Sequence, residues 1–138
     1  MIITILSHSQ LLTHWNTLSV LLQKAIDQNC GEAKLEDYLR KVLNDQAQLW
    51  AIFDKDNNIV GAGVTEVLSY SKQKVFHIFL FAGIDFELQS QVFPIVEAFA
   101  KDCGCVAIEQ WGRKGWAKTL PKYVPGFREV YTVMRKEL

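Results

Sequence analysis

The sequence predicts an α+β domain in three layers, with a mixed, mostly antiparallel β-sheet flanked by helices. Three observations predict this class. Apolar residues recur at three- and four-residue steps in the first third of the chain, as in amphipathic helices. Three β-type runs then follow one another between residues 48 and 82. Later, a strand, a helix and another strand follow in turn, which requires a parallel pair joined by a right-handed crossover.

The first half of the chain is expected to begin with one strand and two helices. Residues 2–6 form a short β-branched run, and Ser7 or Ser9 can cap the helix that follows. Each helix carries one apolar stripe. The stripe residues are Leu11, Trp15, Leu18 and Leu22 in the first helix, and Leu35, Tyr38, Leu39, Val42 and Leu43 in the second.

The pattern then changes to β-structure. Strands are expected over residues 48–53 and 59–68, joined by a turn at residues 54–58 that is rich in Asp and Asn. Residues 75–82 are almost continuously apolar, which is typical of a central strand buried on both faces.

The second half is expected to contain two helices and two strands. A helix follows Gly83 and stops at Gly104, and Pro94 is expected in its first turn because an interior proline costs about 3 kcal/mol. A strand over residues 105–110, a short helix within 111–123 and a closing strand over 127–135 complete the order β-α-α-β-β-β-α-β-α-β. We therefore expect one domain spanning residues 1–138.

Composition narrows the class of protein. Of 138 residues, 49% are hydrophobic and 22% charged, which is ordinary for a globular domain. Fifteen basic and fifteen acidic residues cancel, so we do not expect a nucleic acid or an anionic membrane as partner. Three cysteines and no signal peptide indicate a soluble cytoplasmic protein with reduced thiols. The Cys103-Gly-Cys105 spacing is weak evidence for a metal site, so no metal is expected.

The C-terminal region carries the clearest local likeness to a known family. A helix is followed by Gly126-Phe127 and by a run that ends in Met-Arg-Lys at residues 134–136. Together with the element order, this tail resembles the GNAT superfamily of N-acetyltransferases. Residues 109–116 are similar to short, divergent acetyltransferase-like proteins of bacteriophages and prophages. The resemblance implies an acyl-CoA N-acyltransferase-like fold, acetyl-CoA as cofactor and an amine as substrate.

In that family, backbone N–H groups at a helix N-terminus bind the coenzyme A diphosphate, and glycines let the backbone approach. The corresponding residues 82–90 contain one glycine, no basic residue, and the carboxylates Asp85 and Glu87. Negative charge there would repel a diphosphate, whereas Asp85 is a good helix cap. We therefore expect a degenerate cofactor loop whose backbone still lines the pantetheine arm. The residues concerned are Leu80, Phe81, Ala82, Gly83 and Ile84.

The family's reaction also implies a general base and a general acid. Glu66 and His77 on the central strands are the candidate bases. The alternatives are a solvated edge residue for Glu66 and a core histidine for His77. The family's acid is often a tyrosine before Gly-Phe, where this chain has Leu120, so Tyr123 is the candidate acid. Packing of Tyr123 beneath the last strand is the alternative.

A second candidate site combines two tryptophans with basic residues at a strand-to-helix junction, where mixed sheets bind ligands. Arg beside aromatic faces suits a phosphate, a carboxylate or an acidic peptide. A core role for Trp116, with glycines serving the turn, is the alternative. The candidate residues are Trp111, Arg113, Lys114 and Trp116.

Two functions remain open at this stage. The first is transfer of an acetyl group from acetyl-CoA to an amine. The second is a non-catalytic phage or prophage interaction protein, or a virion-associated one, that retains the fold and binds a partner through Trp111 to Trp116. A phage-encoded chain would act in the host cytoplasm.

Overall fold

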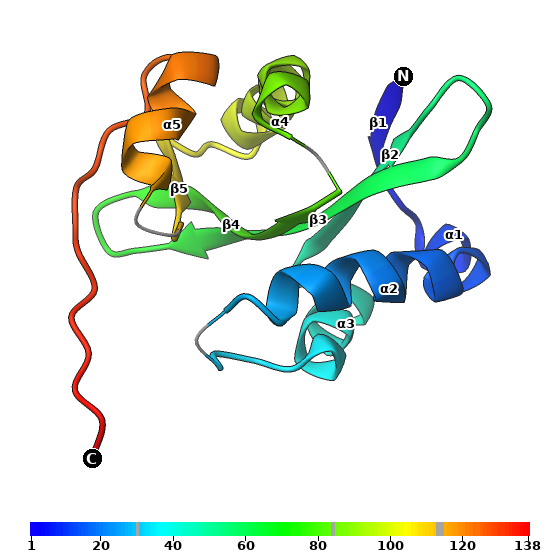
Figure 1. Cartoon of the computed structure of the whole chain (residues 1–138), viewed down its shortest axis with the longest axis horizontal. Coiled ribbons are helices and arrows are strands. Elements are labelled where there is room, and N and C mark those ends of the chain that lie inside the picture. Colours follow the sequence, from blue (N-terminus) through cyan, green and yellow to red (C-terminus); the bar gives the residue numbers. More distant parts are fainter. Residues whose placement is uncertain (30, 84, 113–114) are drawn as a thin grey trace.

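A five-stranded sheet with helices on both faces forms the body of the protein (Figure 1). This computed structural model describes residues 1–29, 31–83, 85–112 and 115–138. The strands lie in the order β1-β2-β3-β4-β5; β4 and β5 are parallel and the other neighbouring pairs are antiparallel. The predicted α+β class and mixed sheet are confirmed. The strands are Ile2–Ile5 (β1), Gln48–Phe53 (β2), Ile59–Ser69 (β3), Lys74–Ala82 (β4) and Ala107–Gln110 (β5).

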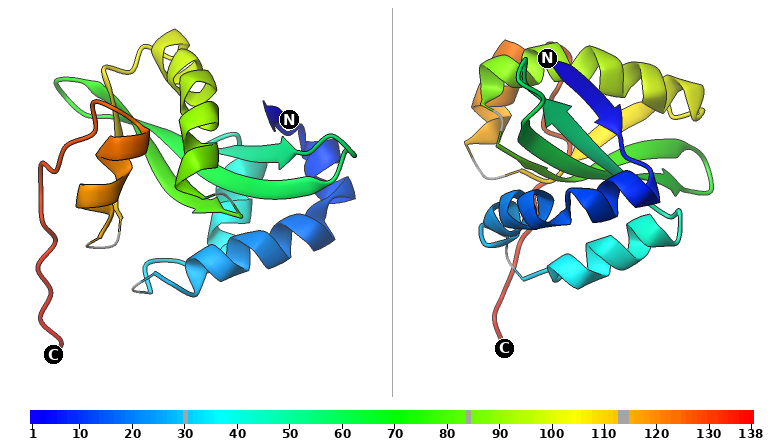
Figure 2. Two further views of the ribbon diagram at one scale, coloured as in Figure 1. Left: turned by 45° about the horizontal axis from the view of Figure 1, so that its top comes forward. Right: turned by 90° about the vertical axis from the view of Figure 1, so that its right-hand side faces the viewer.

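Helices α1, α2 and α3 cover one face of the sheet, and α4 and α5 cover the other (Figure 2). Ser7 caps α1 by accepting a hydrogen bond from the Gln10 backbone N–H, and the Gln10 side chain accepts one from Ser7 in return. The predicted first helix is interrupted at His14, which ends α1 and begins α2. The helices are His8–Thr13 (α1), Trp15–Ile26 (α2), Leu35–Leu43 (α3), Phe86–Asp102 (α4) and Trp116–Tyr123 (α5).

Strand β4 lies inside the sheet, as its apolar run predicts. It pairs antiparallel with β3 on one side and parallel with β5 on the other, and α4 makes the crossover between the two parallel strands. Val75, Phe76 and Ile78 are fully buried on it. β4 therefore fixes the position of every element around the candidate site.

The expected place of Pro94 is wrong. The proline lies inside α4 rather than in its first turn. Its neighbours Val92, Phe93 and Val96 are buried, whereas Pro94 itself is exposed. The backbone hydrogen bond that a proline removes is therefore lost on the solvent side, where water can replace it, while packing holds the buried side of the helix. Ile95, expected on the apolar face, is 47% exposed.

The expected closing strand over residues 127–135 is also wrong. In the structure these residues are extended but pair with no strand among the described residues, and the chain leaves the body as a tail (Figure 2). An alternating pattern predicts that a segment fits a sheet, but only a partner strand makes it one. Val124 is the last buried residue of the chain. The neighbouring elements begin later than expected, β5 at Ala107 and α5 at Trp116.

Candidate active site

Glu66 on β3 and His77 on β4 lie directly opposite each other in the antiparallel pair. Opposite residues project from the same face of a sheet. That face is the one covered by α3, because the Glu66 carboxylate accepts hydrogen bonds from Lys41 Nζ at 3.1 and 3.3 Å. The structure thus brings the two candidate bases together.

Lys41 is a member of this site that the sequence reasoning missed. It lies on α3, off the apolar stripe, where a lysine is ordinarily a solvated residue. Its side chain is 40% exposed, and that of its partner Glu66 only 15%. Helical spacing shows which face Lys41 occupies but not that the edge of this face meets β3, so no signal in the sequence identifies the pair.

Aromatic rings enclose the imidazole of His77. The ring centroids of Phe79 and Trp111 lie 4.7 and 5.2 Å from that of His77, both edge-on. His77 is only 5% exposed, whereas Trp111 is 72% exposed. Trp111 therefore forms the outer wall of the site, with one side toward His77 and the other toward solvent.

This enclosure changes the proton affinity of His77. Burial lowers the pKa of His77 below its ordinary value of 6.5, and the nearby Glu66 carboxylate opposes this only in part. At neutral pH the imidazole is consequently uncharged and has a nitrogen lone pair available to accept a proton. A neutral histidine opposite a carboxylate is an arrangement suited to general base chemistry.

A β-bulge in β4 follows His77. Val64 pairs with Leu80 and Thr65 pairs with Ile78, so Phe79 has no partner on β3. As a result Phe79 and Leu80, adjacent in sequence, both pack on the side of α2 and α3. The bulge redirects the second half of β4 immediately beyond the site.

Beyond this bulge, β4 and β5 separate. The last pair between them joins Ile78 to Gln110, where β5 ends, whereas β4 continues to Ala82. The β4 backbone at residues 79–82 therefore has an edge that β5 does not cover. Bulges of this kind bend a strand away from its neighbour and often lie next to binding sites.

The structure brings most of the predicted cofactor-lining residues to this open edge. The side chains of Leu80 and Ala82 are buried, and Phe81 packs over Gly63, so only backbone groups can line a ligand here. Gly83 has a positive φ of +78°, and a Cβ on it would collide with the Val60 carbonyl, so this position requires glycine. Ile84 lies outside the described residues.

Two buried side-chain amide oxygens have no hydrogen-bond partner among the described residues. They are Oε1 of Gln110, which ends β5, and Oε1 of Gln89 in α4. An unsatisfied buried acceptor costs about 1–3 kcal/mol, which a donor from a ligand would offset. The amide N–H groups of a pantetheine arm are donors of this kind.

The N-terminus of α4 does not fit the diphosphate of the same cofactor. Asp85 caps this helix, its carboxylate accepting a hydrogen bond from the Leu88 N–H at 2.8 Å, as the sequence predicts. Glu87 adds a second acidic residue to the first turn. One backbone donor of this helix end is thus bound by the protein's own Asp85, and two carboxylates lie at the positive end of the helix dipole, which binds anions elsewhere.

Tyr123, the candidate acid, lies on the opposite side of the sheet from His77. Helix α5 packs through Leu120 and Val124 against Ile78 and Phe93, on the α4 side. Leu120, which stands at the family's acid position, is a core residue. Tyr123 is 42% exposed and is the last residue of α5.

The two tryptophans of the junction differ in environment. Trp111 is exposed and borders His77, whereas Trp116 is half-buried and lies over Gly112, where an added Cβ would meet its ring at 2.9 Å. The close approach of the Trp116 ring explains why residue 112 is a glycine. Arg113 and Lys114 lie outside the described residues. Trp111 is therefore the member of this cluster that the structure joins to the Glu66–His77 site.

Solved structures with the same fold include acetyltransferases of several kinds. A GNAT family acetyltransferase from Staphylococcus aureus aligns with a TM-score of 0.70 and 19% identity, covering 99% of this chain and 98% of that one. A soil metagenomic aminoglycoside acetyltransferase in complex with sisomicin gives 0.69 and 19%, covering 99% and 95%. Glucosamine-6-phosphate N-acetyltransferase from Arabidopsis thaliana gives 0.68 and 16%, covering 99% and 97%. Neither a protein-family model nor a curated protein sequence matches the chain.

These likenesses establish the architecture. The chain has the acyl-CoA N-acyltransferase-like fold of the GNAT acetyltransferases, and the likeness extends over its whole length. Identities below 20% establish no more than the fold, and what the site does must be argued from its own residues. Among the described residues no helix is both long and apolar enough to cross a membrane, and no cluster of His, Cys, Asp and Glu could hold a metal ion.

Proposed function

We propose that this protein is an N-acyltransferase that moves an acetyl group from acetyl-CoA to an amine, with a weakened grip on the cofactor's diphosphate. The observation that carries the proposal is the Glu66–His77 pair, held beneath Trp111 and next to the uncovered edge of β4. This arrangement supports a proton acceptor beside the backbone edge along which a pantetheine arm would lie.

The base accepts the proton that the amine loses on attacking the acyl carbon. His77 is uncharged at neutral pH because burial lowers its pKa, so its imidazole can accept that proton. Glu66 is the second candidate, and its carboxylate also favours the imidazolium that a protonated His77 becomes. Lys41 fixes the orientation of that carboxylate. The geometry favours a shared role, with one residue accepting the proton and the other stabilising the charge.

The cofactor would contribute an activated acetyl thioester. The backbone of residues 79–83, together with the orphan oxygens of Gln89 and Gln110, would hold its arm. Tyr123 is proposed as the acid that protonates the departing thiolate, because the family resemblance implies a tyrosine in this helix and Leu120 cannot donate a proton. Trp111 and the junction residues Arg113, Lys114 and Trp116 would shape the acceptor side.

The proposal is tested by binding and turnover together. Acetyl-CoA at millimolar concentration should raise the melting temperature of the protein, since a ligand that binds only the native state stabilises it. Release of free thiol in the presence of a panel of primary amines should then exceed the rate of hydrolysis. Absence of both thermal stabilisation and thiol release would exclude the acyltransferase function.

A non-catalytic role is the second candidate, and Asp85 together with Trp111 favours it. The acidic cap opposes the anion that the fold ordinarily binds, and a tryptophan that is 72% exposed suits a partner interface. On this view Trp111→Ala abolishes partner capture from the native host lysate while leaving the melting temperature unchanged. Capture that survives the substitution would remove Trp111 from any interface.

The setting of this activity is a further part of the proposal. The likeness of residues 109–116 to phage and prophage acetyltransferase-like proteins supports a phage or prophage origin. The charge balance and reduced cysteines support action in the cytoplasm of the host. Fractionation of cells that express the native gene tests this directly.

A further inference from the structure

The side chain of Lys41 ends inside the candidate active site. Its Nζ lies 3.1 and 3.3 Å from the two carboxylate oxygens of Glu66, the residue opposite His77. The same nitrogen lies 5.7 Å from the centre of the Phe79 ring, which borders the His77 imidazole. A primary amine of the protein therefore lies beside both candidate bases, where the proposed reaction requires its acceptor.

The surroundings of this nitrogen suit an amine on an alkyl stem. The Glu66 carboxylate attracts the ammonium form, and the face of Phe79 adds a cation–π contact. The Lys41 side chain is nevertheless 40% exposed. An ion pair that is open to solvent to this extent is only weakly stabilising, so the amine can separate from the carboxylate and react.

The position of Phe79 relates the amine to the proposed cofactor arm. Phe79 has no partner on β3, and β4 and β5 separate after Ile78. The arm is proposed to lie along residues 79–83, with its diphosphate end toward α4 and Asp85. Its thioester end would then lie toward Phe79, and so toward the Lys41 amine.

We propose that Lys41 is a site of self-acetylation, at which Nζ takes the acetyl group from an acyl thioester bound by the same chain. This inference rests on the proposed function and names a lysine side chain of the protein as an acceptor. The Nζ lone pair forms a C–N bond to the acetyl carbon, and the C–S bond breaks with its electron pair on sulfur. Two protons leave the nitrogen: the Glu66–His77 pair passes the first to water, and the second ends on sulfur as the thiol.

Acetylation would remove the positive charge that faces Glu66. The resulting amide N–H can still donate a hydrogen bond, but it no longer compensates the carboxylate. His77 would then lie between two acidic residues, Glu66 opposite it on β3 and Glu109 as its register partner on β5. The pKa of His77 should consequently rise, which an NMR titration detects without any measurement of turnover.

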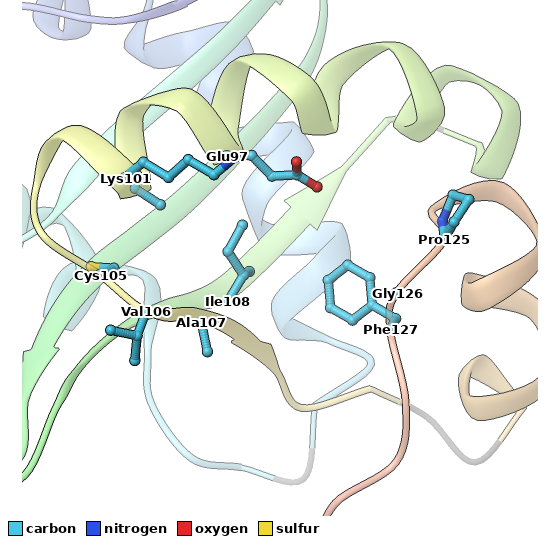
Figure 3. Close-up of a pocket in the computed structure, with 10 residues that line it drawn as sticks. Glu97, Lys101, Cys105, Val106, Ala107, Ile108, Pro125, Gly126 and Phe127 are labelled. Atoms are coloured by element: carbon cyan, nitrogen blue, oxygen red, sulfur yellow. The ribbon is translucent and has the colours of Figure 1, made fainter.

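The first measurement is the rate of acetylation at each lysine, read by peptide mass spectrometry after incubation of the full chain with millimolar acetyl-CoA. Lys101 is the matched control. It is exposed on α4, on the other face of the sheet, and lines a cavity of about 270 Å³ together with Glu97 (Figure 3). Lys41 should react at least roughly 100-fold faster than Lys101, because proximity and a general base act on Lys41 and not on Lys101. Equal rates, or a Lys41 rate that falls on dilution of the protein, overturn the proposal.

Glu66→Gln combined with His77→Gln separates catalysis from simple lysine reactivity. The double variant removes both proton acceptors and also frees Lys41 from its ion pair. Catalysed acetylation of Lys41 should therefore fall to the Lys101 rate, whereas a lysine that is merely reactive would keep or increase its rate. The latter result overturns the proposal. Because His77 is buried, circular dichroism must show that the variant folds; if it does not, the comparison of Lys41 with Lys101 in the natural sequence decides.

Two substitutions at residue 41 complete the test. Lys41→Gln carries an uncharged amide like that of the acetylated residue, and Lys41→Arg keeps the charge but lacks the amine. NMR titration should give a higher pKa for His77 in acetylated protein and in Lys41→Gln than in untreated protein, and Lys41→Arg should keep its value after the same incubation. A rise in Lys41→Arg as well would assign the effect to another residue and overturn the proposal.

These measurements distinguish failure of self-acetylation from failure of the proposed function. Thiol release with external amines while Lys41 stays unmodified would overturn self-acetylation alone. No thiol release with any amine, together with no modified lysine, would overturn both.

Discussion

The middle and the exit of strand β4 differ in how well they suit the proposed acetyl transfer. In the middle, His77 is buried, has a lowered pKa and lies opposite Glu66, an arrangement that suits a general base. At the exit, Asp85 and Glu87 place negative charge where the fold's relatives are expected to bind a diphosphate. The comparison teaches that the proposed base and the proposed anchor for the cofactor's far end lie on separate elements, so one can change without the other.

The largest effect is expected from substitutions at the middle of β4 and at the residue opposite it on β3. Glu66→Gln and His77→Gln each remove a candidate proton acceptor, and loss of the true base should lower kcat/KM by roughly 10²- to 10⁴-fold. Steady-state thiol release with acetyl-CoA and a reactive amine measures this. Glu36→Gln, at an exposed position on α3, is the matched control. Near-normal activity in both variants would exclude this pair from catalysis.

The next largest effect is expected at the C-terminal end of β4, where Asp85 is proposed to oppose the cofactor's diphosphate. Asp85→Asn removes a charge while keeping a residue that caps helices equally well, so acetyl-CoA should bind about 5-fold more tightly at low salt without a change in stability. Asp85→Ala removes the cap as well and should cost about 1 kcal/mol in the free energy of unfolding. Titration calorimetry and urea denaturation give the two quantities. Unchanged affinity in Asp85→Asn would show that this carboxylate does not oppose the cofactor.

A third prediction concerns pH. The folded-state pKa of His77 lies below 6.5, so the histidine stays neutral as pH falls to that value and protonates only below it. If His77 is the base, the acid limb of kcat/KM should have an apparent pKa below 6.5. The unfolded chain takes up its proton first, so His77 should also destabilise the fold as pH falls through 6.5 toward the folded pKa. An acid limb centred above 7, or acid sensitivity unchanged in His77→Gln, contradicts this account.

The smallest effect concerns Trp111. Because its side chain is largely exposed, Trp111→Ala should change the free energy of unfolding by no more than about 0.5 kcal/mol. The same substitution opens the outer wall of the His77 site, so KM for the amine should rise while the affinity for acetyl-CoA does not change. A loss of cofactor affinity instead would place Trp111 on the donor side.

Local chemistry made part of this structure predictable. The continuous apolar run of β4 predicts an interior strand, and Asp85 before a helix predicts a cap; both are confirmed. These features are decided by neighbouring residues alone. The sequence also identifies Glu66 and His77 individually, because polar residues on central strands are unusual.

Features that depend on distant contacts could not be predicted. Whether Pro94 lies early in its helix or in the middle depends on which side of α4 is buried. The pairing of Lys41 with Glu66 depends on how α3 lies across the sheet. The alternating pattern at residues 127–135 is typical of a strand, but it does not show which sheet edge this segment would pair with.

The central claim is that the pantetheine arm of the cofactor binds along β4, whereas the contact of its diphosphate with α4 contributes little binding free energy. The most direct measurement compares the dissociation constants of acetyl-CoA and S-acetyl-pantetheine, which lacks the nucleotide and the diphosphate. We predict that the two dissociation constants lie within about 5-fold of each other. The reason is that a charge at an exposed helix end contributes no more than about 1 kcal/mol. A preference of 100-fold or more for acetyl-CoA, or no binding of either compound at millimolar concentration, would contradict the account.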